Sequence, residues 1–128
     1  MTTANIETMS TIVDYLAEGK KFSKVLRHVY NKRHFFIPLE DIMLDVGVDK
    51  LKMSNRVTNA LMRAHMRTIQ DVVDYCNKNK ILTIKALGVD SGIEIFEAIL
   101  DYCWNNMDND ARTRFLIDVV TRNAANKR

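Results

Sequence analysis

The residues of this chain best suited to chemistry are cations that gather near its N-terminal end. Between Lys20 and His34 the sequence has six lysines and arginines and no acidic residue: Lys20, Lys21, Lys24, Arg27, Lys32 and Arg33. On a helix, Lys20, Lys24 and Arg27 would share one face, and such a face suits the phosphate groups of a nucleic acid. Two other interpretations stay open, namely a solvated helix face and a contact with the acidic stretch from Glu40 to Asp49.

Residue groups typical of catalysis or metal binding do not occur in the sequence. His28, His34 and His65 are dispersed, and no cluster of carboxylates or cysteines accompanies them. Cys76 and Cys103 lack the close spacing of a zinc site, which favours two reduced thiols in a core. Metalloprotease, phosphate-loop, dinucleotide and nucleophile motifs are also missing. We therefore expect no enzyme, no metal and no cofactor.

The composition favours a helical globular protein. Of the 128 residues, 47% are hydrophobic and 27% are charged, which is enough to bury a core without disulfides or metals. One proline and four glycines argue against a turn-rich β-sandwich. No apolar stretch approaches the roughly 20 residues of a membrane span, and no signal-peptide pattern opens the sequence. We expect a cytoplasmic protein without membrane contact.

Apolar periodicity then predicts the elements in the first half of the sequence. A stripe that begins at Ile6 and ends at Leu16 predicts a helix over 5–18, which Gly19 terminates. Ser23 is the predicted N-cap of a second helix that runs to Asn31. Pro38 suits the first turn of a short third helix, which ends before Gly47.

Capping residues predict the later helices. Ser54, Thr68 and Asp108 are candidate N-caps, and residues 81–87 suit a short helix. Ser91 and Glu94 have the spacing of a capping box, although Asp90 is an alternative cap. The fold class is therefore all-α, a compact domain of five to seven helices.

Four motifs between residues 49 and 100 point to a family. They are Leu51-Lys52-Met53-Ser54, Arg56 to Asn59, Thr68-Ile69-Gln70-Asp71-Val72, and Leu87 to Ile95. In order and spacing this stretch resembles the C-terminal domain of the bacterial RNA polymerase α subunit. The resemblance implies a helical unit with helix-hairpin-helix-like elements. It also implies binding in the minor groove of A·T-rich DNA and contact with transcription activators.

The same resemblance assigns roles to individual residues. Arg56 would enter the minor groove, and Asn59 would reach the DNA backbone or a base edge. Gly88 would let the loop approach phosphates closely, and Ser91 with the amides at the helix start would hold a phosphate. Glu94 would support the group by orienting Arg56. Lys24 and Arg27 in the basic segment would add affinity that does not depend on DNA sequence.

Three positions depart from the family pattern and keep alternatives open. Val89 and Asp90 stand where the family has basic residues, and an aspartate repels phosphate. Gly92 replaces a residue that is usually apolar in the family. Arg56 and Asn59 also suit an ordinary exposed helix face. The alternative function is therefore a protein-interaction module that lost DNA binding, such as a phage or mobile-element mimic of a host domain.

The expected organisation has three parts. Residues 1–44 form an N-terminal helical extension, 45–104 form the unit that resembles the α C-terminal domain, and 105–128 form a C-terminal helix and tail packed on it. The expected function is a non-enzymatic, transcription-linked accessory protein. Its expected partners are DNA and RNA polymerase or a transcription factor. The apolar stripe near the N-terminus must pack on the domain or on a second copy, which leaves a homodimer open.

Overall fold

The computed structural model describes residues 2–30, 36–79, 84 and 87–126, and helices dominate these ranges. The α-helices are α1 (Thr3–Ala17), α2 (Phe22–Val29), α3 (Asn55–Arg63), α4 (Ile69–Lys78), α5 (Val89–Asn106) and α6 (Asn109–Arg122). The described ranges also hold the short 3-10 helices η1 (Asp41–Met43) and η2 (Val48–Lys50), between α2 and α3, and η4 (Ala124–Asn126), after α6. The all-α prediction of five to seven helices is confirmed. The short helix predicted over 81–87 falls largely outside the described residues.

Local capping chemistry starts three of these helices as predicted. The side chains of Ser54, Thr68 and Asp108 accept hydrogen bonds from the backbone amides three residues ahead, at the starts of α3, α4 and α6. These bonds satisfy amides that have no partner inside the helix. Gly19 ends α1 with a φ of 87°, a left-handed conformation that glycine adopts without steric cost.

Two predicted caps are wrong, because serine has another use at each position. Ser23 lies inside α2, where its backbone amide and its hydroxyl both donate hydrogen bonds to the Asp101 carboxylate, at 3.0 and 2.7 Å. Ser91 lies inside α5, whose N-cap is Gly88 and whose first bond joins the Gly92 amide to the Gly88 carbonyl. Asp90 is likewise a first-turn residue of α5 and not its cap. The Ser91–Glu94 capping box is therefore absent.

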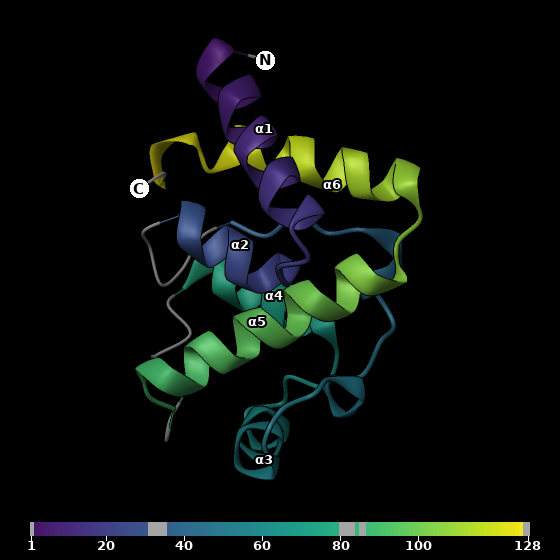
Figure 1. The fold of residues 1–128 in the computed structure, drawn as a ribbon. Helices are drawn as coiled ribbons and strands as arrows, with labels where there is room; N and C mark the ends of the chain where they lie inside the picture. Colours follow the sequence, from purple (N-terminus) through teal and green to yellow (C-terminus); the bar gives the residue numbers. More distant parts are fainter. Residues whose placement is uncertain (1, 31–35, 80–83, 85–86, 127–128) are drawn as a thin grey trace.

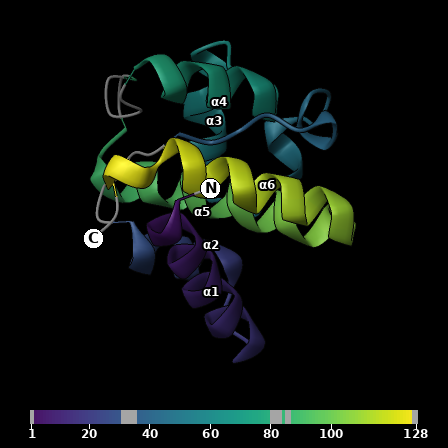
Figure 2. The same cartoon turned by 90° about the horizontal axis from the view of Figure 1, so that it is seen from above.

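α5 is the central helix of the arrangement. It packs against α2, while α1 packs against both α2 and α6. Figure 1 places α1 and α6 at one end of the molecule and α3 at the other. In the view from above, α1 and α2 lie on one side of α5 and α6, and α3 and α4 lie on the opposite side (Figure 2). The N-terminal helices thus cover a face of α5 that α3 and α4 do not occupy.

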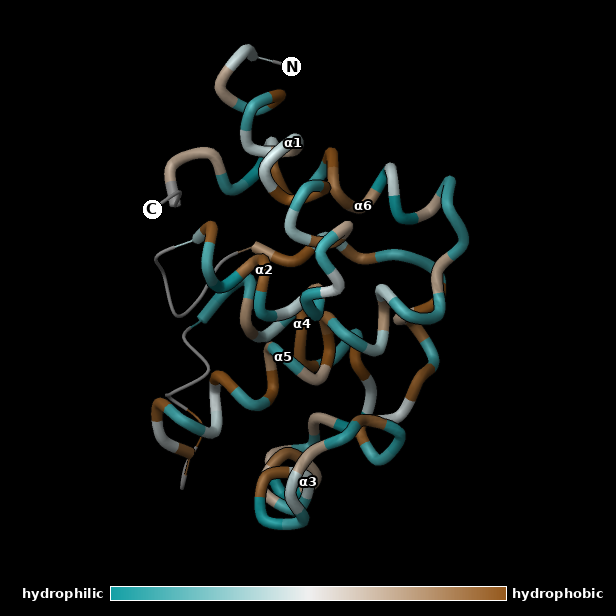
Figure 3. Tube along the Cα trace, in the orientation of Figure 1, coloured by the Kyte–Doolittle hydropathy of each residue, from teal (hydrophilic) through white to brown (hydrophobic). Residues whose placement is uncertain are grey.

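One hydrophobic core joins these elements. Hydrophobic residues recur at intervals along the helices, with hydrophilic residues between them (Figure 3). The fully buried side chains come from every part of the sequence and include Ile12, Leu26, Leu61, Ile99 and Phe115. Burial of such side chains is the main force that holds the helices together. Among the described residues, no helix has the length and apolarity to cross a membrane.

Candidate nucleic-acid interface

The starts of α3 and α5 meet at the predicted DNA-contact residues. Arg56, in the first turn of α3, donates a hydrogen bond from Nη2 to Ser91 Oγ at 2.6 Å. The Arg56 side chain is exposed, whereas Ser91 is buried in the first turn of α5. A contact between residues 35 positions apart therefore holds the guanidinium at the surface above the start of α5.

Glu94 makes a second connection between these two helices. Its carboxylate accepts a short hydrogen bond from the backbone amide of Ser54, the N-cap of α3. A carboxylate that binds the amide of a helix cap fixes the direction in which the helix starts. Glu94 thus positions the start of α3. Arg56, which follows Ser54 by two residues, is positioned with it.

The other two predicted contact residues lie at exposed positions nearby. Asn59 follows Arg56 by three residues on α3, which puts both side chains on neighbouring parts of one helix face. Gly88 is exposed at the N-cap of α5, and a Cβ added there would meet no atom within 4 Å. Its φ of −115° is also open to any residue. The fold itself therefore does not require glycine at this position.

The first turn of α5 carries two of the three departures from the family pattern. Val89 and Asp90 are both exposed there. An acidic residue in a first turn interacts favourably with the positive end of the helix dipole, so Asp90 stabilises α5 while it opposes an incoming phosphate.

The basic segment makes its ion pairs inside the molecule. Lys24 Nζ and Arg27 Nη1, both on α2, bind the same oxygen of Glu97 on α5 at 2.8 and 2.9 Å. Burial would raise the pKa of Glu97, but the hydrogen bonds and charges of Lys24 and Arg27 outweigh it and lower the pKa below its ordinary 4.5. Lys32, Arg33 and His34 lie outside the described residues.

The intramolecular contact expected for the basic segment involves different acids. Its described ion pairs reach Glu97 on α5, whereas one of the three interpretations open from the sequence was a contact with the stretch from Glu40 to Asp49. Glu40 instead lies 3.8 Å from Arg114 on α6. No local sequence signal identifies Glu97 or Asp101 as partners of α2, because each lies more than 65 residues beyond it in the sequence.

The described part of the protein offers no metal centre. It contains no group of three or more histidine, cysteine, aspartate or glutamate side chains arranged to hold an ion. Cys76 and Cys103 are buried free thiols, as predicted, and burial raises the pKa of each to about 12. Thiols with such a high pKa stay protonated at neutral pH and are poor nucleophiles.

Comparison with known proteins gives one match. The family model of the C-terminal domain of the bacterial RNA polymerase alpha subunit matches residues 38–101, which is half of the sequence and includes Arg56, Asn59, Gly88, Ser91 and Glu94. No curated protein and no solved structure matches the sequence.

Proposed function

Because the protein belongs to the family of C-terminal domains of the bacterial RNA polymerase α subunit, we propose that it is a non-enzymatic, transcription-linked accessory protein that binds DNA in the minor groove. The observation that carries the proposal is the hydrogen bond between Arg56 and Ser91. The family resemblance assigns DNA contacts to the starts of α3 and α5, and this hydrogen bond joins the two starts at one place on the surface.

In the proposed complex, Arg56 enters the minor groove. The narrow groove of A·T-rich DNA concentrates negative potential, which attracts an arginine side chain. Asn59 contacts the DNA backbone or a base edge beside it. A phosphate approaches the first amides of α5 at Gly88 and Ser91, where the helix dipole favours an anion.

The remaining parts of the protein have supporting roles in this proposal. Residues 45–104 form the DNA-contacting unit, while 1–44 and 105–128 flank it. Lys24 and Arg27 add long-range attraction to DNA, although Glu97 offsets part of their charge. The partner protein is RNA polymerase or a transcription factor, and the site of action is the cytoplasm.

The proposal is tested by fluorescence anisotropy with A·T-rich and G·C-rich duplexes at low and high salt. We expect a preference for A·T-rich DNA and weaker binding at high salt. Arg56→Ala should reduce affinity by about 1–3 kcal/mol and relax the preference. Arg63→Ala, at the far end of the same helix, is the matched control and should change affinity little. Absence of binding at low salt, or binding indifferent to Arg56, would refute the mechanism.

Exposed Asp90 favours a second candidate function. With Val89 and Asp90 at the first turn of α5, the protein would act as an interaction module that mimics or inhibits a host protein and binds DNA weakly or not at all. Capture of RNA polymerase or one of its factors by both the native protein and Arg56→Ala, with no DNA binding by either, would support this alternative.

A homodimer through the N-terminal helices is a further proposal. Ile6 and Val13 of α1 are 52% and 49% exposed, the two highest values among the exposed large apolar side chains of the described residues. Light scattering of the native protein and of an Ile6→Ser/Val13→Ser variant tests it. A dimer that persists in the variant, or a native monomer, would contradict the proposal.

A further inference from the structure

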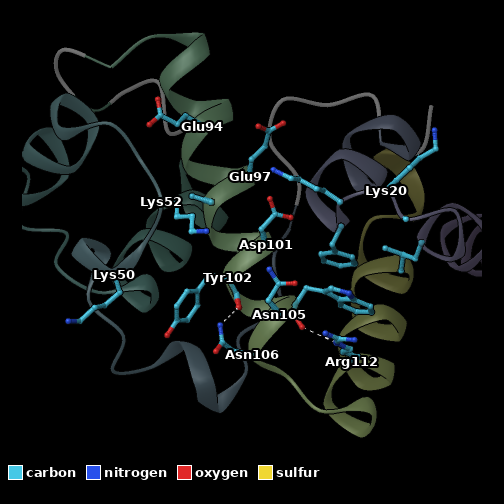
Figure 4. A pocket seen from close by; sticks show the side chains of 16 residues that line it. Lys20, Lys50, Lys52, Glu94, Glu97, Asp101, Tyr102, Asn105, Asn106 and Arg112 are labelled. Carbon is cyan, nitrogen blue, oxygen red and sulfur yellow. Dashed lines mark hydrogen bonds between the residues drawn. The ribbon is translucent and has the colours of Figure 1, made fainter.

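A groove with a volume of about 870 Å³ runs along α5 and adjoins the proposed DNA interface at Glu94. Glu94, Glu97 and Asp101 lie along its floor, as Figure 4 shows. Lys50 and Lys52, from the connection that leads into α3, lie on one side, and Lys20 lies on the other. The second wall belongs to the connection between α1 and α2 and lies outside residues 38–101, the family match.

The acidic side chains on the floor already have partners within the molecule. Glu94 accepts a hydrogen bond from the Ser54 amide, and Asp101 accepts two from Ser23. Glu97 binds two cations of α2. Glu97 is therefore neutralised by the cations of α2, whereas Glu94 and Asp101 are held by neutral donors and keep their negative charge.

The lysines on the two rims are in the opposite situation. Lys20, Lys21, Lys50 and Lys52 are exposed, and across the described ranges none of them forms an ion pair. The Lys20 ammonium group lies 5.4 Å from the centroid of the Tyr15 ring, a contact that leaves its charge available. With Arg112, five cationic side chains line the groove against three acidic ones, an excess of two positive charges.

Aromatic residues also line the groove. The rings of Trp104 and Phe22 stack with centroids 4.2 Å apart and planes inclined by 7°. The Arg112 guanidinium lies 4.7 Å from the centroid of the Trp104 ring, and its Nε donates a hydrogen bond to the Trp104 carbonyl. Phe22 and Arg112 thus cover the faces of the Trp104 ring and hold it in place, and the ring remains partly exposed in the lining of the groove.

We propose that this groove binds an acidic peptide segment of a protein partner. Carboxylates of the peptide pair with the lysines on both rims, and an apolar side chain of the peptide lies against Trp104. The negative charges of a peptide can be far apart, so a peptide can place them at the lysines and away from the carboxylates on the floor. The phosphates of a nucleic acid are regularly spaced, so some of them would face these carboxylates directly. The groove is therefore a protein-binding site that is separate from the DNA contacts at Arg56.

The test uses Trp104, the single tryptophan of the protein, as an internal reporter. The probe is a synthetic peptide of glutamate and glycine with one central leucine, and the control peptide has glutamine in place of glutamate. We expect the acidic peptide to shift Trp104 emission and the control peptide to leave it unchanged. Lys50→Glu/Lys52→Glu should weaken binding by about tenfold or more, since both contacts on that rim become repulsive.

A matched variant separates the groove from net charge. Arg63→Glu/Lys78→Glu changes the net charge by the same amount at exposed positions outside the groove and should leave peptide affinity nearly unchanged. Circular dichroism checks that both variants fold. If Lys50→Glu/Lys52→Glu does not fold, Lys50→Gln/Lys52→Gln takes its place. Equal weakening by the two reversals would overturn the proposal.

Two further experiments show whether the groove binds a peptide or a nucleic acid, and whether the groove and the Arg56 site act independently. If an A·T-rich duplex shifts Trp104 emission and displaces the peptide in a manner that depends on Lys50 and Lys52, the occupant is nucleic acid and the proposal is wrong. Arg56→Ala should keep full peptide affinity. A protein that binds DNA but not the peptide refutes the groove alone, and one that binds the peptide but not DNA refutes the minor-groove function alone.

Discussion

Asn123, directly after α6, holds Phe36 by both of its backbone groups. The Phe36 amide donates to Asn123 Oδ1 at 2.7 Å, and Asn123 Nδ2 donates to the Phe36 carbonyl at 2.8 Å. Asn77 on α4 binds the amide and carbonyl of Ile37 in the same way, at 3.2 and 3.0 Å. Two side-chain amides thus give this extended segment the hydrogen bonds that a neighbouring strand would otherwise supply.

Asn123→Ala should destabilise the fold. Asn123 is fully buried, and its loss removes the hydrogen bonds to the amide and the carbonyl of Phe36, whereas the Val119 carbonyl keeps its bond from the backbone amide of residue 123. We expect the free energy of unfolding, measured with urea, to fall by about 2–4 kcal/mol. Thr121→Ala, at an exposed position on α6, is the control. A loss below about 1 kcal/mol would mean that water replaces the amide easily.

Glu97 should make stability depend on acidic pH. Its pKa is lower in the folded protein than the ordinary 4.5, because Lys24 and Arg27 outweigh the effect of burial. The contribution of Glu97 to stability is therefore complete above about 4.5 and is lost as the pH falls through the lowered value. Glu97→Gln should be less stable than the native protein near neutral pH, and the difference should shrink in acid.

Urea unfolding at a series of pH values from neutral to strongly acidic measures this effect. Glu7→Gln, on the exposed side of α1, serves as the control and should run parallel to the native protein. A difference between Glu97→Gln and the native protein that stays constant across the acidic range would show that the contacts with Lys24 and Arg27 do not couple to protonation.

Gly88→Ala should separate DNA binding from stability. A Cβ at Gly88 meets no atom within 4 Å, so we expect the free energy of unfolding to change by less than about 0.5 kcal/mol. The same methyl group would hold a phosphate away from the amides of α5 and cost about 1 kcal/mol of DNA affinity, the value of one hydrogen bond. Anisotropy and urea unfolding measure the two quantities.

Gly19→Ala is the control for Gly88→Ala, because it makes the same substitution away from the proposed DNA contact. Gly19 has a φ of 87°, so alanine there should lower stability by about 1 kcal/mol and leave DNA affinity unchanged. Full DNA affinity in Gly88→Ala would argue against a close phosphate at the start of α5.

Asp90→Lys should strengthen DNA binding. The change removes a repulsive charge from the first turn of α5 and adds a cation that releases one more counterion from DNA. We expect tighter binding at low salt and a slope of affinity against salt that is steeper by about 1. The cost to stability should be about 0.5 kcal/mol, because an acid leaves the first turn of a helix.

Asp110→Lys provides a control of the same kind. Asp110 occupies the first turn of α6, so the two variants share the change in charge and the effect on the helix dipole. Identical salt slopes for the two variants would mean that the start of α5 is not a phosphate contact.

The sequence predicted interactions between residues close together in the sequence better than contacts between different helices. Ser54 and Thr68 were identified as caps because a capping bond spans three residues and leaves a local pattern. The serine at position 91 has the same local pattern, yet it lies inside α5 and binds Arg56 from another helix. His65 marks a second limit: its φ of 63° is uncommon for residues other than glycine, and the enrichment of histidine in this conformation is too weak to predict it at one position.

The sequence by itself determined the all-α class, most helix boundaries and the family, together with the set of residues assigned to DNA contact. Periodicity, capping and motif order are local properties that a polypeptide displays without folding. Only the tertiary structure decided that α2 uses Lys24, Arg27 and Ser23 to bind α5, and that Lys20 lies on the opposite side of one groove from Lys50 and Lys52. Contacts between residues tens of positions apart depend on how helices pack, and packing follows from the shape of the whole core rather than from any local pattern.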